Sequence, residues 1–178
     1  MPPAAPTAAP PPRIAWAVSA MDLPDRGSVL EIGCGRGLAV ELICEAAPQL
    51  QVFAIDRSEA MVTAARQRNA SHIHAGRAQI HLGQLDTVLG ASERYDVVFA
   101  VNVSVFWTKP MVPPLRALRR LVRPGGAFHL FYDAPTAAKV AEITSSLLLA
   151  LPAAGVVDPI AHRPEDGSPN LAGISALV

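Results

Sequence analysis

Three glycines and a carboxylate alternate near the start of the chain. Segment 31–37 reads EIGCGRG and places Glu31, Gly33, Gly35 and Gly37 directly after a strand-like apolar run and directly before a helical pattern. Glycines let a backbone turn sharply and approach a ligand closely, and the strand–turn–helix setting favours a binding loop over a simple tight turn. The sequence therefore predicts that a ligand binds at this loop.

The spacing of these glycines differs from that of a dinucleotide-binding loop. A G-x-G-x-x-G fingerprint counted from Gly33 needs its third glycine at position 38, where the chain has Leu38. Glu31 also brings negative charge to the approach, where it would repel a pyrophosphate. A nicotinamide-dependent oxidoreductase is therefore disfavoured, although it stays open as an alternative.

A second acidic residue, Asp56, comes at the end of the next apolar run. A carboxylate in this place can accept hydrogen bonds from both hydroxyls of a ribose. The alternative is structural, with Asp56 capping the helix that follows.

The elements that would position these residues alternate between short apolar runs and helical patterns. The expected strands are 28–32, 51–55, 78–82, 95–101 and 127–132, with two more at 156–160 and 171–178, and the expected helices are 38–47, 58–69 (with Ser58 as N-cap) and 136–151. Leu115, Leu118 and Val122 mark one face of a further helix, which should end before a chain break at Pro124-Gly125-Gly126. Such alternation predicts a parallel sheet covered on both faces, with ligands beyond the carboxyl ends of its strands.

Taken in order, the glycine loop and Asp56 resemble the cofactor site of class I S-adenosylmethionine-dependent methyltransferases. The resemblance covers residues 25–135 well and the last forty weakly. It implies S-adenosyl-L-methionine as cofactor and an α/β fold, a Rossmann-like three-layer αβα sandwich. The sheet would have seven mostly parallel strands and an antiparallel last strand at 171–178.

The same resemblance implies roles for further residues. Arg57 would lie against the adenine, with Met61 one helical turn on, although Met61 also suits a core position. Gln84 replaces the acid that binds the adenine amine in relatives, and Asp86 could serve instead. The implied cofactor-binding residues are Glu31, Gly33, Cys34, Gly35, Gly37, Asp56, Arg57, Met61, Gln84, Leu85 and Asn102.

Methyl transfer from a sulfonium needs an in-line arrangement more than acid–base groups, so no catalytic residue is assigned. Candidates on the acceptor side lie at strand ends facing the expected cleft. They are Asn102, Ser104, Trp107, Tyr132 and Asp133. Of these, Trp107 and Tyr132 are the candidates for contact with the substrate, although the usual location of aromatic residues favours a packing role for Phe106 and Trp107.

The composition of the chain limits the kinds of substrate and partner that it is expected to bind. Fifteen basic residues balance fifteen acidic ones, which argues against a nucleic-acid substrate. No apolar run is long enough to cross a bilayer, and neither two cysteines nor the dispersed histidines suggest a metal site. We therefore expect a cytoplasmic protein with a small-molecule acceptor, no metal and no membrane contact; its oligomeric state is left open.

Residues 1–13 are rich in proline and alanine and are expected to form a disordered tail before a single domain at 14–178. Ordered structure should begin near Ile14 with a helical turn around Trp16 and Val18. The predicted function is S-adenosylmethionine-dependent methyl transfer to an unidentified acceptor. The alternative is a non-catalytic relative of the methyltransferase fold that serves in binding or assembly, which Gln84 slightly favours.

Overall fold

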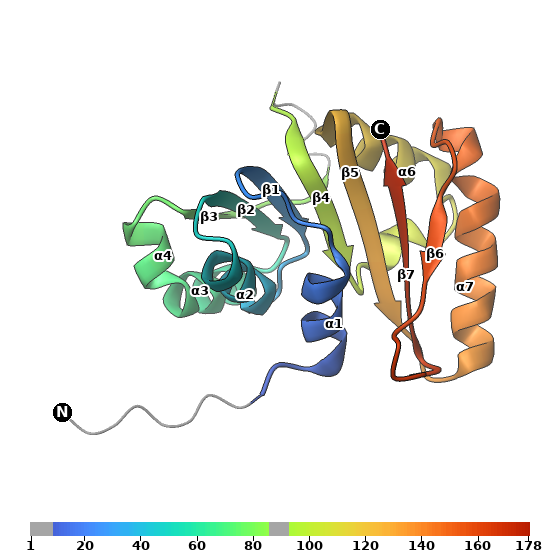
Figure 1. Cartoon of the computed structure of the whole chain (residues 1–178), viewed down its shortest axis with the longest axis horizontal. Helices are drawn as coiled ribbons and strands as arrows, with labels where there is room; N and C mark the ends of the chain where they lie inside the picture. Colours follow the sequence, from blue (N-terminus) through green and yellow to red (C-terminus); the bar gives the residue numbers. More distant parts are fainter. Residues whose placement is uncertain (1–8, 86–92) are drawn as a thin grey trace.

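A computed structural model describes residues 9–85 and 93–178. Within these ranges, seven strands form one sheet in the order β3-β2-β1-β4-β5-β7-β6 (Figure 1). The strands are β1 Gly27–Ile32, β2 Leu50–Asp56, β3 Ala78–Leu82, β4 Tyr95–Val101, β5 Val122–Asp133, β6 Ile160–His162 and β7 Leu171–Leu177. The pairs from β3 to β5 are parallel, and β7 runs antiparallel to both of its neighbours. The predicted fold class and the antiparallel last strand are confirmed.

Helices cover the sheet on two sides. They are α1 Pro12–Ala20, α2 Leu38–Ala46, α3 Glu59–Arg68, α4 Ala70–His74, α6 Val112–Leu121 and α7 Ala137–Ala150, with short 3-10 helices η1 Ser104–Phe106 and η2 Pro152–Ala154. Helices α1, α2 and α3 lie on one side, and α6 and α7 lie on the other (Figure 1). Each of the described helices is too short or too polar to cross a lipid bilayer.

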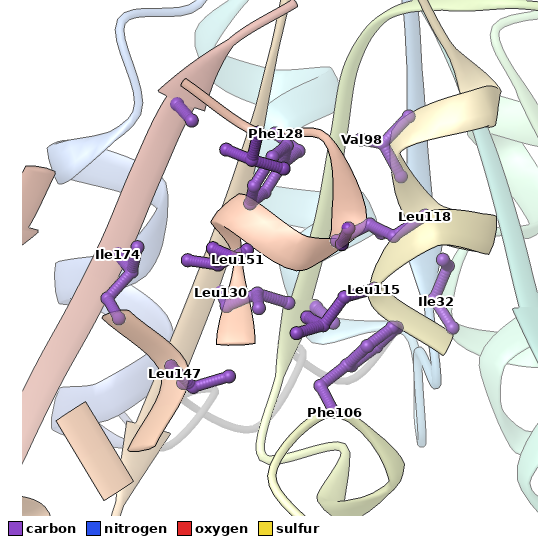
Figure 2. Packing of buried hydrophobic residues seen from close by; sticks show 14 of the residues in the cluster. Ile32, Val98, Phe106, Leu115, Leu118, Phe128, Leu130, Leu147, Leu151 and Ile174 are labelled. Atoms are coloured by element: carbon purple, nitrogen blue, oxygen red, sulfur yellow. The ribbon is translucent and has the colours of Figure 1, made fainter. Parts of the chain in front are cut away.

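Two apolar clusters hold the three layers together. On the side of α6 and α7, Leu118 and Leu147 pack with Phe128 and Leu130 of β5 (Figure 2). On the other side, Phe131 lies against Trp16 of α1 with the ring planes nearly perpendicular. Neighbouring residues of β5 thus face opposite layers, as expected for a strand buried on both faces.

The helix predicted from Leu115, Leu118 and Val122 is α6, but it ends at Leu121. Val122 was wrongly placed on the helix because it is the first residue of β5. The helix ends before Pro124-Gly125-Gly126, as expected, but this segment lies within β5 instead of breaking the chain. The N–H of Gly125 donates to the Val178 carbonyl at 2.6 Å, and the N–H of Val178 donates to the Gly126 carbonyl at 2.9 Å, so the chain end extends the sheet through this segment.

The strand expected at 156–160 is wrong as well, since β6 begins where that range ends. Gly155 and Asp158 have positive φ angles of 84° and 48°, which interrupt extended backbone until Ile160. At the other end of the chain, the helical turn predicted around Trp16 and Val18 is α1, which begins at Pro12 rather than near Ile14.

Candidate functional site

The glycine loop joins β1 to α2 at the carboxyl edge of the parallel strands. Gly33, Gly35 and Gly37 have φ angles of 74°, 53° and 73°, a region that side chains other than glycine rarely adopt. The sequence therefore folds as the motif predicts, with a tight loop between Ile32 and Leu38.

The first three N–H groups of this loop are bonded within the protein. Those of Gly33 and Cys34 both donate to the Ile55 carbonyl, at 2.8 and 3.0 Å. That of Gly35 donates to Oδ2 of Asp56 at 2.8 Å. A pyrophosphate bound in the dinucleotide manner uses the N–H groups of such a loop. These three N–H groups already have acceptors within the protein, so the loop is poorly suited to binding a phosphate.

Glu31 is the most unusual group near the loop. Its side chain is 2% exposed, and Oε2 has no hydrogen-bond partner among the described residues. Burial, and then the negative charge of Asp56, raise the pKa of Glu31 to about 8. A buried carboxyl without a partner is costly, and a ligand with a cationic group would relieve that cost.

Asp56 connects the ends of β1 and β2. Besides the bond from Gly35, its Oδ1 accepts the N–H of Ser58 at 2.9 Å. Ser58 is the N-cap of α3, as predicted, and its hydroxyl accepts the N–H of Met61 at 3.4 Å. Each carboxylate oxygen can accept more than one hydrogen bond, so Asp56 retains acceptor capacity for ligand hydroxyls.

A cavity of about 360 Å³ opens beside the loop. The predicted cofactor residues on its wall are Gly33, Asp56, Arg57, Gln84, Leu85 and Asn102. The remaining ones do not line it: Glu31, Cys34, Gly35, Gly37 and Met61. Asp86, the alternative to Gln84, lies outside the described residues.

Sequence reasoning missed part of the wall. Val103, Val105 and Pro114 line the cavity together with Ser104, which was expected on the acceptor side. A Cβ atom added to Gly33 would lie 2.5 Å from Cγ2 of Val103, so the loop after β4 rests directly on the glycine loop. The sequence signals for this loop are its position after a buried strand and the family resemblance, which indicated the segment but not these three residues.

Tyr132 and Trp107, the two residues expected to contact substrate, lie outside the cavity. Tyr132 is 1% exposed, and its hydroxyl lies 2.7 Å from that of Thr144 in α7. Trp107 packs against the Tyr132 ring, with 5.5 Å between ring centroids. Neither lines the cavity described above, and Phe106 is fully buried.

Cys34 is not set up as a nucleophile. It is buried, and its burial together with the charges of Glu31 and Asp56 raises the pKa of its thiol well above the usual value. Across 9–85 and 93–178, no three His, Cys, Asp or Glu residues are grouped so as to hold a metal ion.

A larger hollow, of about 690 Å³, lies over the starts of β4 and β5 and the far strands β7 and β6. It contains none of the glycine-loop residues. Ligands of open α/β sheets bind beyond the carboxyl ends of the strands, so the smaller cavity is the better candidate despite its size.

Comparison with known proteins decides the family. A family model described as a methyltransferase domain matches residues 30–128, more than half of the chain. The chain belongs to the methyltransferase-domain family. The matched span contains the glycine loop, Asp56 and the loop after β4, and the resemblance found in the sequence is confirmed.

Curated relatives are about a quarter to a third identical to this methyltransferase-domain protein over the matched segments. A trans-aconitate 2-methyltransferase from an Azoarcus species is 31% identical over 119 residues, which cover 64% of this chain and 44% of that protein. A malonyl-[acyl-carrier protein] O-methyltransferase from Priestia megaterium is 25% identical over 100 residues, 56% of this chain and 34% of that protein. The chain thus spans less than half the length of these two relatives.

Solved structures show the same fold. An O-methyltransferase family protein from Burkholderia thailandensis superposes with a TM-score of 0.74 over 93% of this chain and 55% of that one, at 17% identity. A fibrillarin from Aeropyrum pernix, solved with S-adenosyl-L-methionine bound, gives a TM-score of 0.69 over 92% of this chain and 73% of that one, at 15% identity. At these identities the likeness concerns the fold.

Proposed function

We propose that this methyltransferase-domain protein binds S-adenosyl-L-methionine beside the glycine loop and transfers its methyl group to a small-molecule acceptor by in-line displacement. When bound, the cofactor supplies a methyl group already activated by a sulfonium. The chain then has to bind both reactants and align them, which can supply much of the rate enhancement.

One observation supports this proposal more strongly than any other. The N–H groups of Gly33, Cys34 and Gly35 are bonded internally, and two carboxyl groups flank the loop. One of them, Glu31, is buried, and its Oε2 has no hydrogen-bond partner among the described residues. Such a loop suits a ligand that brings an ammonium group and ribose hydroxyls, and does not suit a pyrophosphate. The sulfonium cofactor has the first set of groups and lacks the second.

Roles follow for the residues of the cavity and for those of the adjoining glycine loop and end of β1. Asp56 would accept hydrogen bonds from the ribose hydroxyls, and Arg57, Gln84 and Leu85 would surround the adenine. Asn102 and the loop that follows it would cover the sulfonium end. Glu31 would face the amino group of the methionine moiety, and the glycines would shape the loop.

The acceptor is proposed to be a small molecule, in keeping with relatives named for trans-aconitate. A cytoplasmic location belongs to the same proposal. It is supported by Cys34 and Cys44, the two cysteines of the chain, which are both buried and unpaired.

The test is calorimetric titration with S-adenosylmethionine, S-adenosylhomocysteine and NAD. We expect micromolar binding of the two adenosyl-sulfur ligands and at least tenfold weaker binding by Asp56→Ala, because charged hydrogen bonds to the ribose and the glycine loop are lost. Asp25→Ala, which removes an exposed acid remote from the cavity, is the matched control and should bind as the unmodified protein does. Preference for NAD, or no binding of either sulfur ligand, would contradict the proposal.

A further inference from the structure

Asn102, the first residue after β4, has a backbone conformation that residues other than glycine seldom adopt. Its φ angle is +58°, while its N–H continues the sheet by donating to the Phe131 carbonyl at 2.9 Å. Asparagine tolerates this region better than most residues, but the conformation persists only where the surroundings hold it.

The holding contact comes from Asp133, the last residue of β5. The N–H of Asp133 donates to Oδ1 of Asn102 at 2.8 Å, and Nδ2 of Asn102 donates to Oδ1 of Asp133. Both ends of the Asn102 amide are therefore bound by one residue. This reciprocal pair fixes the side chain, and through it the direction in which the chain leaves β4.

The loop that leaves β4 in this direction forms one wall of the cofactor cavity. Residues 102–105 all line that cavity, and Val103 lies over Gly33 so closely that no side chain would fit there. Asp133 does not line the cofactor cavity. It borders a separate hollow of about 570 Å³ together with Arg13 and Asn170. The contact that links Asp133 to this wall is its pair of hydrogen bonds with Asn102.

We propose that Asp133 is a positioning residue, which sets the loop 102–105 against the glycine loop by clamping the Asn102 amide. The inference rests on the proposed function, because it assigns the loop to the wall of a cofactor site. It assigns a role in the cofactor site to Asp133, which lies outside the cavity and outside the family match at 30–128.

An ion pair is the competing explanation for Asp133. Its Oδ2 lies 3.5 Å from Nη1 of Arg13, but the two side chains are 36% and 43% exposed. Exposed pairs of this kind contribute little. The contact that matters for the loop is the one between Oδ1 and the Asn102 amide, which does not need a charge.

The first experiment measures S-adenosylhomocysteine affinity by calorimetry in three variants. Asp133→Ala removes the acceptor and should weaken binding about tenfold. Asp133→Asn keeps an oxygen acceptor at the same place and should remain within about threefold of the unmodified protein. Arg13→Ala leaves the clamp intact and should not change affinity. Equal affinity of Asp133→Ala and the unmodified protein would overturn the proposal, as would equal losses in all three variants.

A double-mutant cycle shows whether Asp133 acts through Asn102. Asn102→Gly accepts the positive φ without strain but offers no amide to clamp. The variant with both Asn102→Gly and Asp133→Ala should therefore bind no more weakly than Asn102→Gly alone. Additive losses would mean that Asp133 acts by another route, and the clamp would be rejected.

Amide hydrogen exchange without ligand separates this inference from the proposed function. Asp133→Ala should speed exchange at Asn102, Phe106 and Trp107, whose N–H groups are bonded within or beside the loop. If the unmodified protein binds no S-adenosylhomocysteine, the proposed function fails, yet faster exchange would still establish the clamp. Unchanged exchange rates would contradict the proposed role of Asp133 even if the cofactor binds.

Discussion

At the scale of single residues, the glycines of one motif are required for different reasons. A Cβ at Gly33 would meet Val103 of the loop after β4, whereas a Cβ at Gly37 would lie 2.6 Å from Nδ2 of Asn69. That amide is fully buried and donates to the Gly37 carbonyl at 2.8 Å. Gly35 faces open space. The first position therefore serves the ligand cavity, and the last serves the packing of α2 on α3.

Alanine substitutions should separate these roles. Gly33→Ala should displace Val103 and lower S-adenosylhomocysteine affinity at least tenfold, while Gly37→Ala should lower the free energy of unfolding by about 1–3 kcal/mol through overpacking. Gly35→Ala is the matched control, because it carries only the backbone strain of a positive φ. Urea unfolding and calorimetry measure the two effects. A larger affinity loss in Gly37→Ala than in Gly33→Ala would contradict the assignment.

At the scale of elements, one carboxylate joins the starts of three strands. Asp96 at the beginning of β4 accepts the N–H of Ser28 in β1 at 2.7 Å and pairs with Arg123 in β5 at 2.7 Å. The register between β4 and β5 shifts at this point, between Tyr95 and Val97. The carboxylate thus stabilises an irregular part of the sheet with a charge-assisted bond to the backbone.

Asp96→Ala should therefore lower the free energy of unfolding by about 2 kcal/mol, since it leaves the Ser28 N–H without its acceptor. Arg123→Ala should cost less than about 1 kcal/mol, because the arginine is well exposed and its ion pair is screened. Urea denaturation of the two variants checks the order. If Arg123→Ala were the more damaging, the ion pair rather than the backbone bond would hold this corner.

Elements with a strong local pattern were predictable from the sequence. The apolar runs at 78–82 and 95–101 match β3 and β4 residue for residue. The start of β5 was not, because it depends on long-range pairing: Val122 pairs with Tyr95 of β4, and Gly125 and Gly126 bond to Val178. The same division holds at the site. The glycine spacing indicated Gly33, and the end of an apolar run indicated Asp56. The clamp between Asn102 and Asp133 needs two strands brought side by side.

At the scale of the whole molecule, two buried titratable groups on different strands act on stability in opposite directions. Burial raises the pKa of Glu31 in β1 to about 8 from 4.5. Burial, and then the neighbouring His162, lower the pKa of His129 in β5 to about 4 from 6.5. His129 is 6% exposed, with Nδ1 2.6 Å from the Ser175 hydroxyl. Both groups are therefore neutral in the folded protein over much of the range between pH 4.5 and 8.

The signs follow from which state binds more protons. Between pH 4.5 and 8 the folded protein holds the Glu31 proton and the unfolded chain loses it. The contribution of Glu31 to the free energy of unfolding is therefore fully present below pH 4.5 and declines as the pH rises to 8. Between pH 6.5 and 4 the unfolded chain protonates His129 and the folded protein does not. Stability from His129 is complete above 6.5 and declines as pH falls to 4.

The two contributions offset each other between pH 4.5 and 6.5, and only Glu31 acts between 6.5 and 8. Urea unfolding should therefore show a plateau in the first window and a loss of about 2 kcal/mol across the second, at about 1.4 kcal/mol per pH unit. Glu31→Gln should abolish the loss above pH 6.5. His129→Asn, which keeps a polar atom near Ser175, should turn the plateau into a continued rise towards pH 4.5. A flat profile above 6.5 in the unmodified protein would mean that Glu31 is already ionised when folded.

Bound ligand should change this profile in one window only. If the amino group of S-adenosylhomocysteine faces Glu31, saturation with the ligand favours the carboxylate, and the decline between pH 6.5 and 8 should shrink or vanish. Binding at pH 7 should then release about one proton, measured as a dependence of the calorimetric enthalpy on the ionisation enthalpy of the buffer. Glu31→Gln should bind without that release. Proton release that persists in Glu31→Gln would assign the titration to another group and remove Glu31 from the cofactor site.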